Sequence, residues 1–289
     1  MKNVSGLSIA FAVMALAACG GAPAATDAPK PAATSAPQQP AATVAPTPAT
    51  TSLPAADAKL VKAVFAKSLD ANQAPVDPAE EFQGDQPIAF SLQFSGRPRS
   101  GKVSATWLFR NEKIADASVD FADVNSGVIA SIGQDTFAGF KLTPKGRLPV
   151  GEGYSVNVTF DGQPIGSFKF KIAPPPDALP SVIKTAVLAE DADARYRAIN
   201  QATEFKPDQK VVLVGVADFG IYSWMEVKWY VNGKLDEAGT RNASLQESKA
   251  DVPFAFSYLP TGGWPDGKHE VVLIMNGKEV GRYAFTVAK

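Results

Sequence analysis

The stretch GGWPDGKHEVVLIMNGKEVGRYAFTV, residues 262–287, has Asn276-Gly277 near its middle. Apolar residues alternate with other residues on both sides of this dipeptide, at Val271, Leu273, Tyr283, Phe285 and Val287. Asn-Gly between two alternating runs is the strongest short-range hairpin signal, because a type I′ turn needs positive φ at both central residues. The sequence therefore predicts a β-hairpin here.

The same pattern occurs about a hundred residues earlier, in LPVGEGYSVNVTFDGQPIGSFKFKI, residues 148–172. Asp161-Gly162 takes the place of Asn276-Gly277. Three apolar residues behind the turn have counterparts in the later stretch, with Ile165, Phe168 and Phe170 aligned to Val280, Tyr283 and Phe285. Two hairpins of the same design suggest two copies of one unit.

The rest of the body supports a duplication. Residues 63–94 align with residues 186–217 without a gap, and Trp107 and Trp229 lie in the strands predicted to match next. The identical pairs are Ala63/Ala186, Val64/Val187, Ala66/Ala189, Asp70/Asp193, Ala71/Ala194, Ala79/Ala202, Glu81/Glu204, Phe82/Phe205, Asp85/Asp208 and Gln86/Gln209. Internal duplication is therefore the organising feature of the chain.

Each copy is predicted to be a β-sandwich. Short alternating runs recur between turn signals, for example at residues 88–94 and 227–231, and each copy has about 105–110 residues, the size of one sandwich domain. The start of the first copy, KLVKAVFAKSLDA (residues 59–71), fits either a short helix or a strand. We favour a strand because Val61, Ala63 and Phe65 alternate.

The N-terminal sequence predicts that the protein is exported. Lys2 precedes an apolar run from Leu7 to Ala18, which is too short for a transmembrane helix and fits a signal peptide over residues 1–18. The run ends in Leu16-Ala17-Ala18-Cys19, which resembles the lipobox of bacterial lipoproteins. That resemblance implies cleavage before Cys19 and lipidation of this only cysteine. The alternative is an ordinary secretory signal with a chance cysteine.

The resemblance also implies a location. A lipidated Cys19 would hold the chain on a membrane of the bacterial cell envelope, since each buried methylene contributes about 0.8 kcal/mol. Gly20 follows the cysteine where the enterobacterial pattern would place an Asp for inner-membrane retention. An outer-membrane location is therefore favoured, provided that the cell has such a membrane.

Between the cysteine and the duplicated body lies a segment of almost only Ala, Pro, Thr, Ser and Gln, residues 19–56. It has no aromatic residue and no apolar periodicity, so it is predicted to be a disordered tether. A Pro-rich ligand for another protein is the alternative. The body then divides into a first sandwich at 57–173, a Pro-rich joint at 174–181 and a second sandwich at 182–289.

The body as a whole resembles immunoglobulin-like domains carried by bacterial lipoproteins and secreted proteins. The resemblance lies in the Phe pattern, the mid-domain Trp and the lead-in Trp264-Pro265-Asp266-Gly267 before the last hairpin, and it covers most of residues 57–289. The first copy departs from the lead-in, with Leu148-Pro149-Val150-Gly151 instead. What the resemblance implies is the fold, because the family has no single activity.

Few residues suggest catalysis. The only histidine, His269, is expected to be an ordinary surface or rim residue of the last hairpin, so neither a His-based triad nor a zinc site of the usual composition is available. Asp116, Asp120 and Asp123 form the one acidic cluster, which is either a weak calcium loop or, as we favour, a solvated strand and loop. No metal or cofactor is predicted, and a net charge of −1 argues against nucleic acid as a partner.

Aromatic residues are the better lead. Trp107 and Trp229 are predicted to be core residues, and Trp264 to pack under the edge of its sandwich. Trp224 has no counterpart in the first copy and lies in an aromatic-rich stretch that makes a candidate binding surface with Phe219, Tyr222 and Tyr230. The alternative is that these residues fill a contact between the two domains.

The function expected from these observations is a lipid-anchored, non-catalytic binding or adaptor module that engages a protein or glycan of the envelope. One alternative is a purely structural spacer, in which the sandwiches set distance and carry no site. Another is a hydrolase with a carboxylate-based site, which would need two inward carboxylates in a cleft.

Overall fold

The computed structural model describes residues 59–95, 98, 100–124 and 135–289. Within these residues the fold is almost wholly β, with one short helix, α1 (Phe121–Val124). Among the described residues, no helix is long and apolar enough to cross a membrane. The predicted signal peptide, Cys19 and the tether lie outside the described residues.

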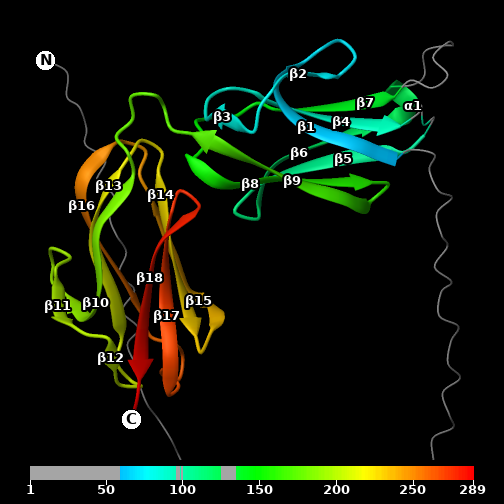
Figure 1. Ribbon diagram of the computed structural model, residues 1–289. Coiled ribbons are helices and arrows are strands. Elements are labelled where there is room, and N and C mark those ends of the chain that lie inside the picture. Colours follow the sequence, from blue (N-terminus) through cyan, green and yellow to red (C-terminus); the bar gives the residue numbers. More distant parts are fainter. Residues whose placement is uncertain (1–58, 96–97, 99, 125–134) are drawn as a thin grey trace, which may run out of the picture. The chain divides into compact units, whose positions relative to one another are not determined.

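The first copy is a sandwich of two sheets (Figure 1). The four-stranded sheet has the order β2 (Pro75–Pro78), β1 (Lys59–Leu69), β4 (Ile88–Ser95), β7 (Thr136–Leu142). The five-stranded sheet has the order β3 (Glu81–Gln83), β9 (Gln163–Ala173), β8 (Gly151–Phe160), β5 (Lys102–Phe109), β6 (Glu112–Asp120). The start of the copy is thus a strand, β1, as its alternation predicted.

The second copy repeats this topology strand for strand. Its four-stranded sheet has the order β11 (Ala198–Gln201), β10 (Val182–Ala192), β13 (Val211–Phe219), β16 (Lys249–Tyr258). Its five-stranded sheet has the order β12 (Glu204–Phe205), β18 (Lys278–Val287), β17 (Gly267–Met275), β14 (Trp224–Val231), β15 (Lys234–Ser244). The predicted fold class, two tandem all-β sandwiches, is confirmed.

Strand registers match between the copies. Phe65 pairs with Phe90 in the first copy, and the aligned Leu188 pairs with Leu213 in the second. Each copy also closes with a short parallel pair that joins the third strand to the last, β3 with β9 and β12 with β18. Since register decides which face of a strand is buried, equal registers give the two copies equivalent cores.

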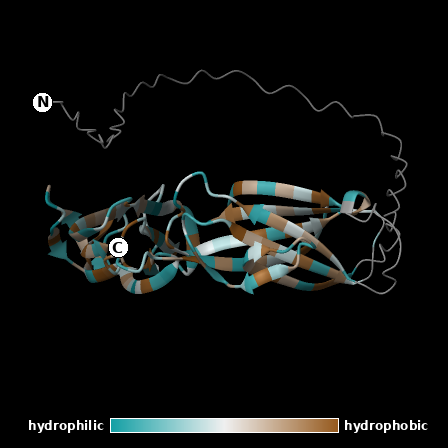
Figure 2. Cartoon of the chain, turned by 90° about the horizontal axis from the view of Figure 1, so that it is seen from above, coloured by the Kyte–Doolittle hydropathy of each residue, from teal (hydrophilic) through white to brown (hydrophobic). Residues whose placement is uncertain are grey.

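Both cores are rich in aromatic side chains, which lie between the sheets because successive side chains alternate between the two faces of a strand. Hydrophobic and hydrophilic residues alternate along strands in Figure 2. In the first sandwich Trp107 packs edge-on against Phe65, Phe90 and Phe170. In the second, Trp229 lies beside Tyr258, Trp264 and Phe285. Trp107 and Trp229 are at most 1% exposed, as predicted for core residues. Trp264, which was predicted to pack under the edge of its sandwich, is 2% exposed and belongs to the second core.

The two predicted hairpins form with the turn geometry that their sequences require. Asn276 and Gly277 have φ of 52° and 86°, and Asp161 and Gly162 have φ of 46° and 81°. Positive φ at both central residues matches the twist of the flanking strands, so the turn joins β17 to β18 and β8 to β9 without splaying them.

His269 is not the surface or rim residue that the sequence suggested. Its side chain is fully buried, Nδ1 accepts the backbone N–H of Asn232 (3.3 Å) and Nε2 lies 2.9 Å from the carbonyl oxygen of Pro265. Because the backbone N–H of Asn232 can only donate, Nδ1 of His269 must be the acceptor, and Nε2 carries the proton. In the first copy the Tyr154 hydroxyl makes the equivalent bond, to the carbonyl of Pro149 (2.7 Å).

This burial predicts a pH dependence of stability. Desolvation lowers the pKa of His269 below 6.5 in the folded protein, whereas the unfolded chain takes up a proton near pH 6.5. The stabilising contribution of neutral His269 is thus present above that pH and lost as the pH falls through the folded pKa. The free energy of unfolding of the wild type, measured with urea, should fall as the pH is lowered from about 7 to about 5. This range lies above the one in which most carboxylates titrate.

Two variants of His269 serve as controls, and one of them introduces the residue that the first copy has at the matching position. His269→Tyr keeps a hydrogen-bonding ring at the position, as at Tyr154, and His269→Gln removes titration without adding a ring. Because His269 is the only histidine, either variant should flatten the decline. If the free energy of unfolding fell equally with pH in the wild type and in both variants, His269 would not be the cause of the pH dependence.

Candidate functional site

The two sandwiches meet at a backbone bulge. Strand β8 pairs with β9 at Gly151 and again at Tyr154, with a register shift between them, whereas the matching pairing of β17 with β18 runs without a shift from Gly267 to His269. The first copy therefore has one additional residue at this point. Bulges of this kind re-aim a strand end, and here the bulged segment contacts the second sandwich.

The contact is made by main-chain groups. The N–H of Val150 donates to the carbonyl of Tyr222, and the N–H of Glu152 donates to the carbonyl of Asn276, each at 2.9 Å. Gly151 lies between them with φ of 107°, so close to Asn276 that an added Cβ would overlap its carbonyl oxygen. Glycine is therefore required at this position both by its backbone conformation and by the lack of space.

Trp224 adds side-chain contacts. Its indole N–H donates to the carbonyl of Val150 (2.9 Å), its ring meets Phe109 edge-on at 5.6 Å, and the guanidinium of Arg110 lies 4.9 Å from its ring centroid. Phe109 and Arg110 belong to the first sandwich and Trp224 to the second. An aromatic ring that is 4% exposed and also hydrogen-bonded thus helps to fix the junction.

An ion pair completes the junction. The Arg110 Nη2 atom lies 2.7 Å from Oε1 of Glu226, whose side chain is 10% exposed. Lys228 lies 3.4 Å from the other carboxylate oxygen of Glu226. A buried carboxylate needs such partners, because removing it from water without them costs several kcal/mol.

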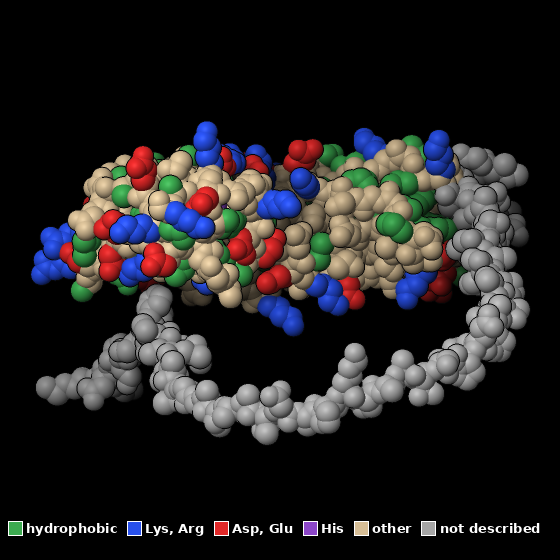
Figure 3. All heavy atoms as spheres, turned by 90° about the horizontal axis from the view of Figure 1, so that it is seen from below, with side chains coloured by type: hydrophobic (Ala, Val, Ile, Leu, Met, Phe, Trp, Pro, Cys, Tyr) green, Lys and Arg blue, Asp and Glu red, His purple; other side chains and the backbone are tan. Residues whose placement is uncertain are grey.

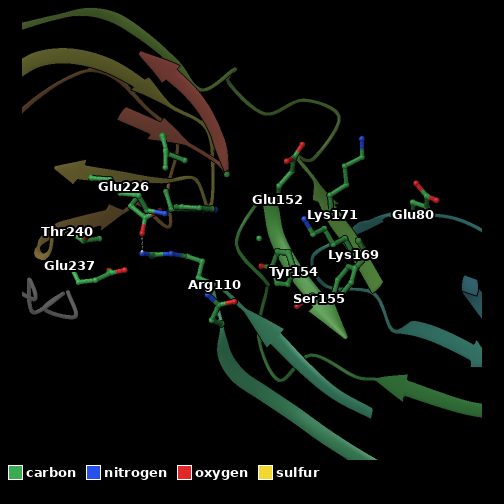
Figure 4. Close-up of a pocket in the computed structure, with 17 residues that line it drawn as sticks. Glu80, Arg110, Glu152, Tyr154, Ser155, Lys169, Lys171, Glu226, Glu237 and Thr240 are labelled. Carbon is green, nitrogen blue, oxygen red and sulfur yellow. Dashed lines mark hydrogen bonds and ion pairs between the residues drawn. The ribbon is translucent and has the colours of Figure 1, made fainter. Parts of the chain in front are cut away.

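Beside this junction lies a cleft of about 700 Å³ that is lined by both sandwiches. In the close-up, Glu152, Tyr154, Ser155, Lys169 and Lys171 lie on the first-sandwich side and Glu226, Glu237 and Thr240 on the other, with Arg110 between them (Figure 4). The volume is in the range of small-molecule and peptide pockets, which often form where two domains meet.

The cleft is lined by side chains of both charges. Its charged lining residues are Glu80, Glu152, Glu226, Glu237, Arg110, Lys169, Lys171 and Lys228. Acidic and basic side chains are also interspersed over the face seen in the space-filling view (Figure 3). Equal numbers of acidic and basic groups give no field that would favour a polyanion such as nucleic acid.

Not all of these charges are paired. Arg110 and Lys228 share Glu226, and Lys171 lies 3.4 Å from Glu81. Among the described residues no ion-pair partner within 4 Å is found for Lys169 or for three carboxylates of the lining, those of Glu80, Glu152 and Glu237. Three carboxylates of the cleft are therefore unpaired, against Lys169 and the one positive charge by which Arg110 and Lys228 together exceed Glu226.

The four aromatic residues predicted as a binding surface do not form one exposed face. Phe219 is 3% exposed in the core of the second sandwich, and Trp224 is buried at the junction. Tyr222 also lies at the junction, half-buried, with Arg147 5.7 Å from its ring. Tyr230 lies further along β14, where Arg282 is 5.9 Å from its ring. Trp224 and Tyr222 therefore lie in a contact between the two domains, which was the alternative to a binding surface.

The acidic cluster is a solvated strand end. Asp116 pairs with Lys113 at 3.1 Å, and Asp120 accepts the N–H of Ala122 at 2.9 Å at the start of α1. In the described part of the chain no three His, Cys, Asp or Glu side chains lie close enough together to hold a metal ion.

Sequence reasoning missed most of the junction, namely Val150, Gly151, Glu152, Arg110 and Glu226. A signal was present, since GEGY at 151–154 has one residue more than the aligned stretch before His269. The charged residues of the cleft carried no such signal, because exposed Lys and Glu occur on many strands.

Comparisons with known proteins show no family for this chain. No protein-family model matches the sequence, and the search of curated proteins finds no match. Similar solved structures include red sea bream transglutaminase (9% identity, TM-score 0.26, 81% of this chain and 31% of that one) and latent PorU from Porphyromonas gingivalis (8%, 0.24, 82% and 21%). A DUF4785 family protein from Legionella pneumophila is a third (12%, 0.22, 72% and 54%). The chain spans less than two thirds of each of these proteins.

Proposed function

We propose that this chain is a lipid-anchored, non-catalytic adaptor of the bacterial cell envelope, in which two sandwiches act as one binding unit. The anchor is Cys19, and the ligand contacts the cleft at the junction. The observation that carries the binding part is that main-chain hydrogen bonds from Val150 and Glu152 join the sandwiches directly beside a cleft that both of them line.

Such a junction suits binding better than catalysis. Two domains that are already joined present a ligand with a preformed surface, so little conformational entropy is lost on binding. Neither the histidine nor the cysteine is available for chemistry in the cleft, since His269 is buried in a core and Cys19 is the proposed lipid carrier. The function is therefore proposed to lie in recognition.

A structural spacer is the second candidate, and the same hydrogen bonds favour it. A pair of sandwiches that is joined through the main chain keeps a fixed distance between its ends whether or not the cleft is occupied. The two candidates differ in one respect, because a spacer needs no partner in the cleft.

The anchor is tested by metabolic labelling with an alkyne fatty acid, followed by cell fractionation. We expect label on the wild type and recovery in the membrane fraction, and loss of both in Cys19→Ser, because the serine hydroxyl cannot replace the thiol in lipidation. An unlabelled, soluble wild-type chain would overturn the anchor.

The adaptor is tested by photocrosslinking in cells. A photoreactive residue at Lys169 or Glu237, one on each side of the cleft, should give the same discrete crosslinked product. The matched positions are Lys67 and Lys249, which are exposed and do not line the cleft, and these should not give it. Failure of both cleft positions would favour the spacer.

A further inference from the structure

We infer that the cleft at the junction binds a short, extended polypeptide segment rich in Lys and Arg. This inference rests on the proposed adaptor function and gives the chemical class of its ligand. It follows from three properties of the lining, namely the state of its aromatic rings, the balance of its unpaired charges and its mixture of donors and acceptors.

The aromatic rings argue against a glycan. Proteins that bind neutral sugars stack them on exposed aromatic faces. The three rings that line the cleft, of Trp224, Tyr154 and Phe170, are at most 4% exposed. The indole N–H of Trp224 and the hydroxyl of Tyr154 already donate to the carbonyls of Val150 and Pro149. The cleft therefore offers a sugar neither a free face nor a free aromatic donor.

The unpaired charges favour a cation. Glu80, Glu152 and Glu237 are exposed and have no ion-pair partner among the described residues. Two positive charges oppose these three carboxylates, namely Lys169 and the one charge by which Arg110 and Lys228 together exceed Glu226. A ligand with two or more positive side chains would supply these exposed carboxylates with the partners that they lack. Long Lys or Arg side chains can reach carboxylates on both sandwiches from one backbone.

The remaining polar groups favour a peptide over a simple polyamine. Asn111, Ser155 and Lys169 line the same cleft and offer hydrogen-bond donors. A polyamine has no acceptor for them, whereas an extended peptide has one carbonyl per residue. A chain that places basic side chains towards Glu152 and Glu237 can therefore also satisfy the donors with its backbone.

The test is a selection followed by direct binding. A library of random dodecapeptides on phage is selected against the full-length chain in detergent micelles. Enriched peptides are synthesised with a fluorophore, and their affinity is measured by anisotropy. We expect peptides with a net positive charge, whose affinity falls several-fold as the salt concentration is raised from 0.05 to about 0.5 M.

The variants place the peptide in the cleft. Glu152→Gln combined with Glu237→Gln removes two unpaired carboxylates, one from each sandwich, and leaves the main-chain N–H of Glu152 in place. It should weaken binding about tenfold, as expected for two exposed charge contacts. The control combines Asp77→Asn with Glu247→Gln. It removes the same charge from exposed positions outside the cleft and should change affinity less than twofold.

Three outcomes would overturn the inference. They are the absence of enriched peptides, enrichment of acidic or neutral peptides, and equal affinity for wild type and Glu152→Gln/Glu237→Gln. Cleft-dependent binding on a glycan array would replace the peptide by a sugar. In each of these cases the adaptor itself would still be judged by the crosslinks from Lys169 and Glu237, so the two proposals fail separately.

Discussion

Gly151→Ala should separate the two sandwiches. The new methyl group would overlap the carbonyl oxygen of Asn276, and alanine would have to adopt φ of 107°, a conformation that costs a non-glycine residue roughly 1–3 kcal/mol. The main-chain bonds from Val150 and Glu152 would be lost with the contact, at about 1 kcal/mol each. We expect urea unfolding to become biphasic, and proteases to cleave the joint at 174–181 more readily.

Two further glycines make this prediction specific. Gly277→Ala approaches the contact from the second sandwich, since its Cβ would lie 2.7 Å from that of Glu152, and it should have the same effect. Gly162→Ala also has positive φ, 81°, but its Cβ would meet nothing within 4 Å. It should cost only about 1 kcal/mol and leave the joint protected. Equal behaviour of all three variants would show that the junction does not couple the sandwiches.

The hairpins and cores could be predicted from the sequence because their signals are local. Asn276-Gly277 and Asp161-Gly162 select a turn whatever surrounds them, and alternation decides which face of a strand is buried. The duplication strengthens both signals, since the second copy is an independent instance of the first. Trp107 and Trp229 were therefore placed in their cores without any knowledge of tertiary structure.

His269 shows where this reasoning fails. A lone polar residue in a strand is usually exposed, and the sequence gives no sign that Asn232 and Pro265 will satisfy both ring nitrogens. The aligned Tyr154 was the informative residue, because a ring with a polar atom at the same place in the first copy indicates a buried site with a hydrogen-bond partner.

The junction could not be predicted because it depends on geometry between copies. The additional residue at 151–154 is visible in the sequence, but only the fold shows that the resulting bulge meets the turns at Tyr222 and Asn276. Trp224 was correctly singled out as lacking a counterpart in the first copy. Its indole N–H reaches Val150 only once the two sandwiches lie together.

Trp229→Ala is expected to have the second large effect, within one sandwich. The indole of Trp229 is fully buried between Tyr258, Trp264 and Phe285. Replacing a buried Trp by Ala leaves a cavity and costs about 3–5 kcal/mol. Urea unfolding should show this loss. In a Gly151→Ala background, where the sandwiches unfold separately, only the transition of the second sandwich should move, whereas Trp107→Ala should move only that of the first.

Replacing Trp229 by Phe instead of Ala tests what its indole N–H contributes to stability. Nε1 of Trp229 is buried without a hydrogen-bond partner among the described residues, whereas Nε1 of Trp264 donates to the carbonyl of Gln209 at 3.0 Å. Trp229→Phe removes an unsatisfied donor and Trp264→Phe breaks a bond, so the first should be less destabilising by about 1 kcal/mol. The reverse order would mean that the Trp229 N–H has a partner, such as a buried water, and that its burial is not a cost to the fold.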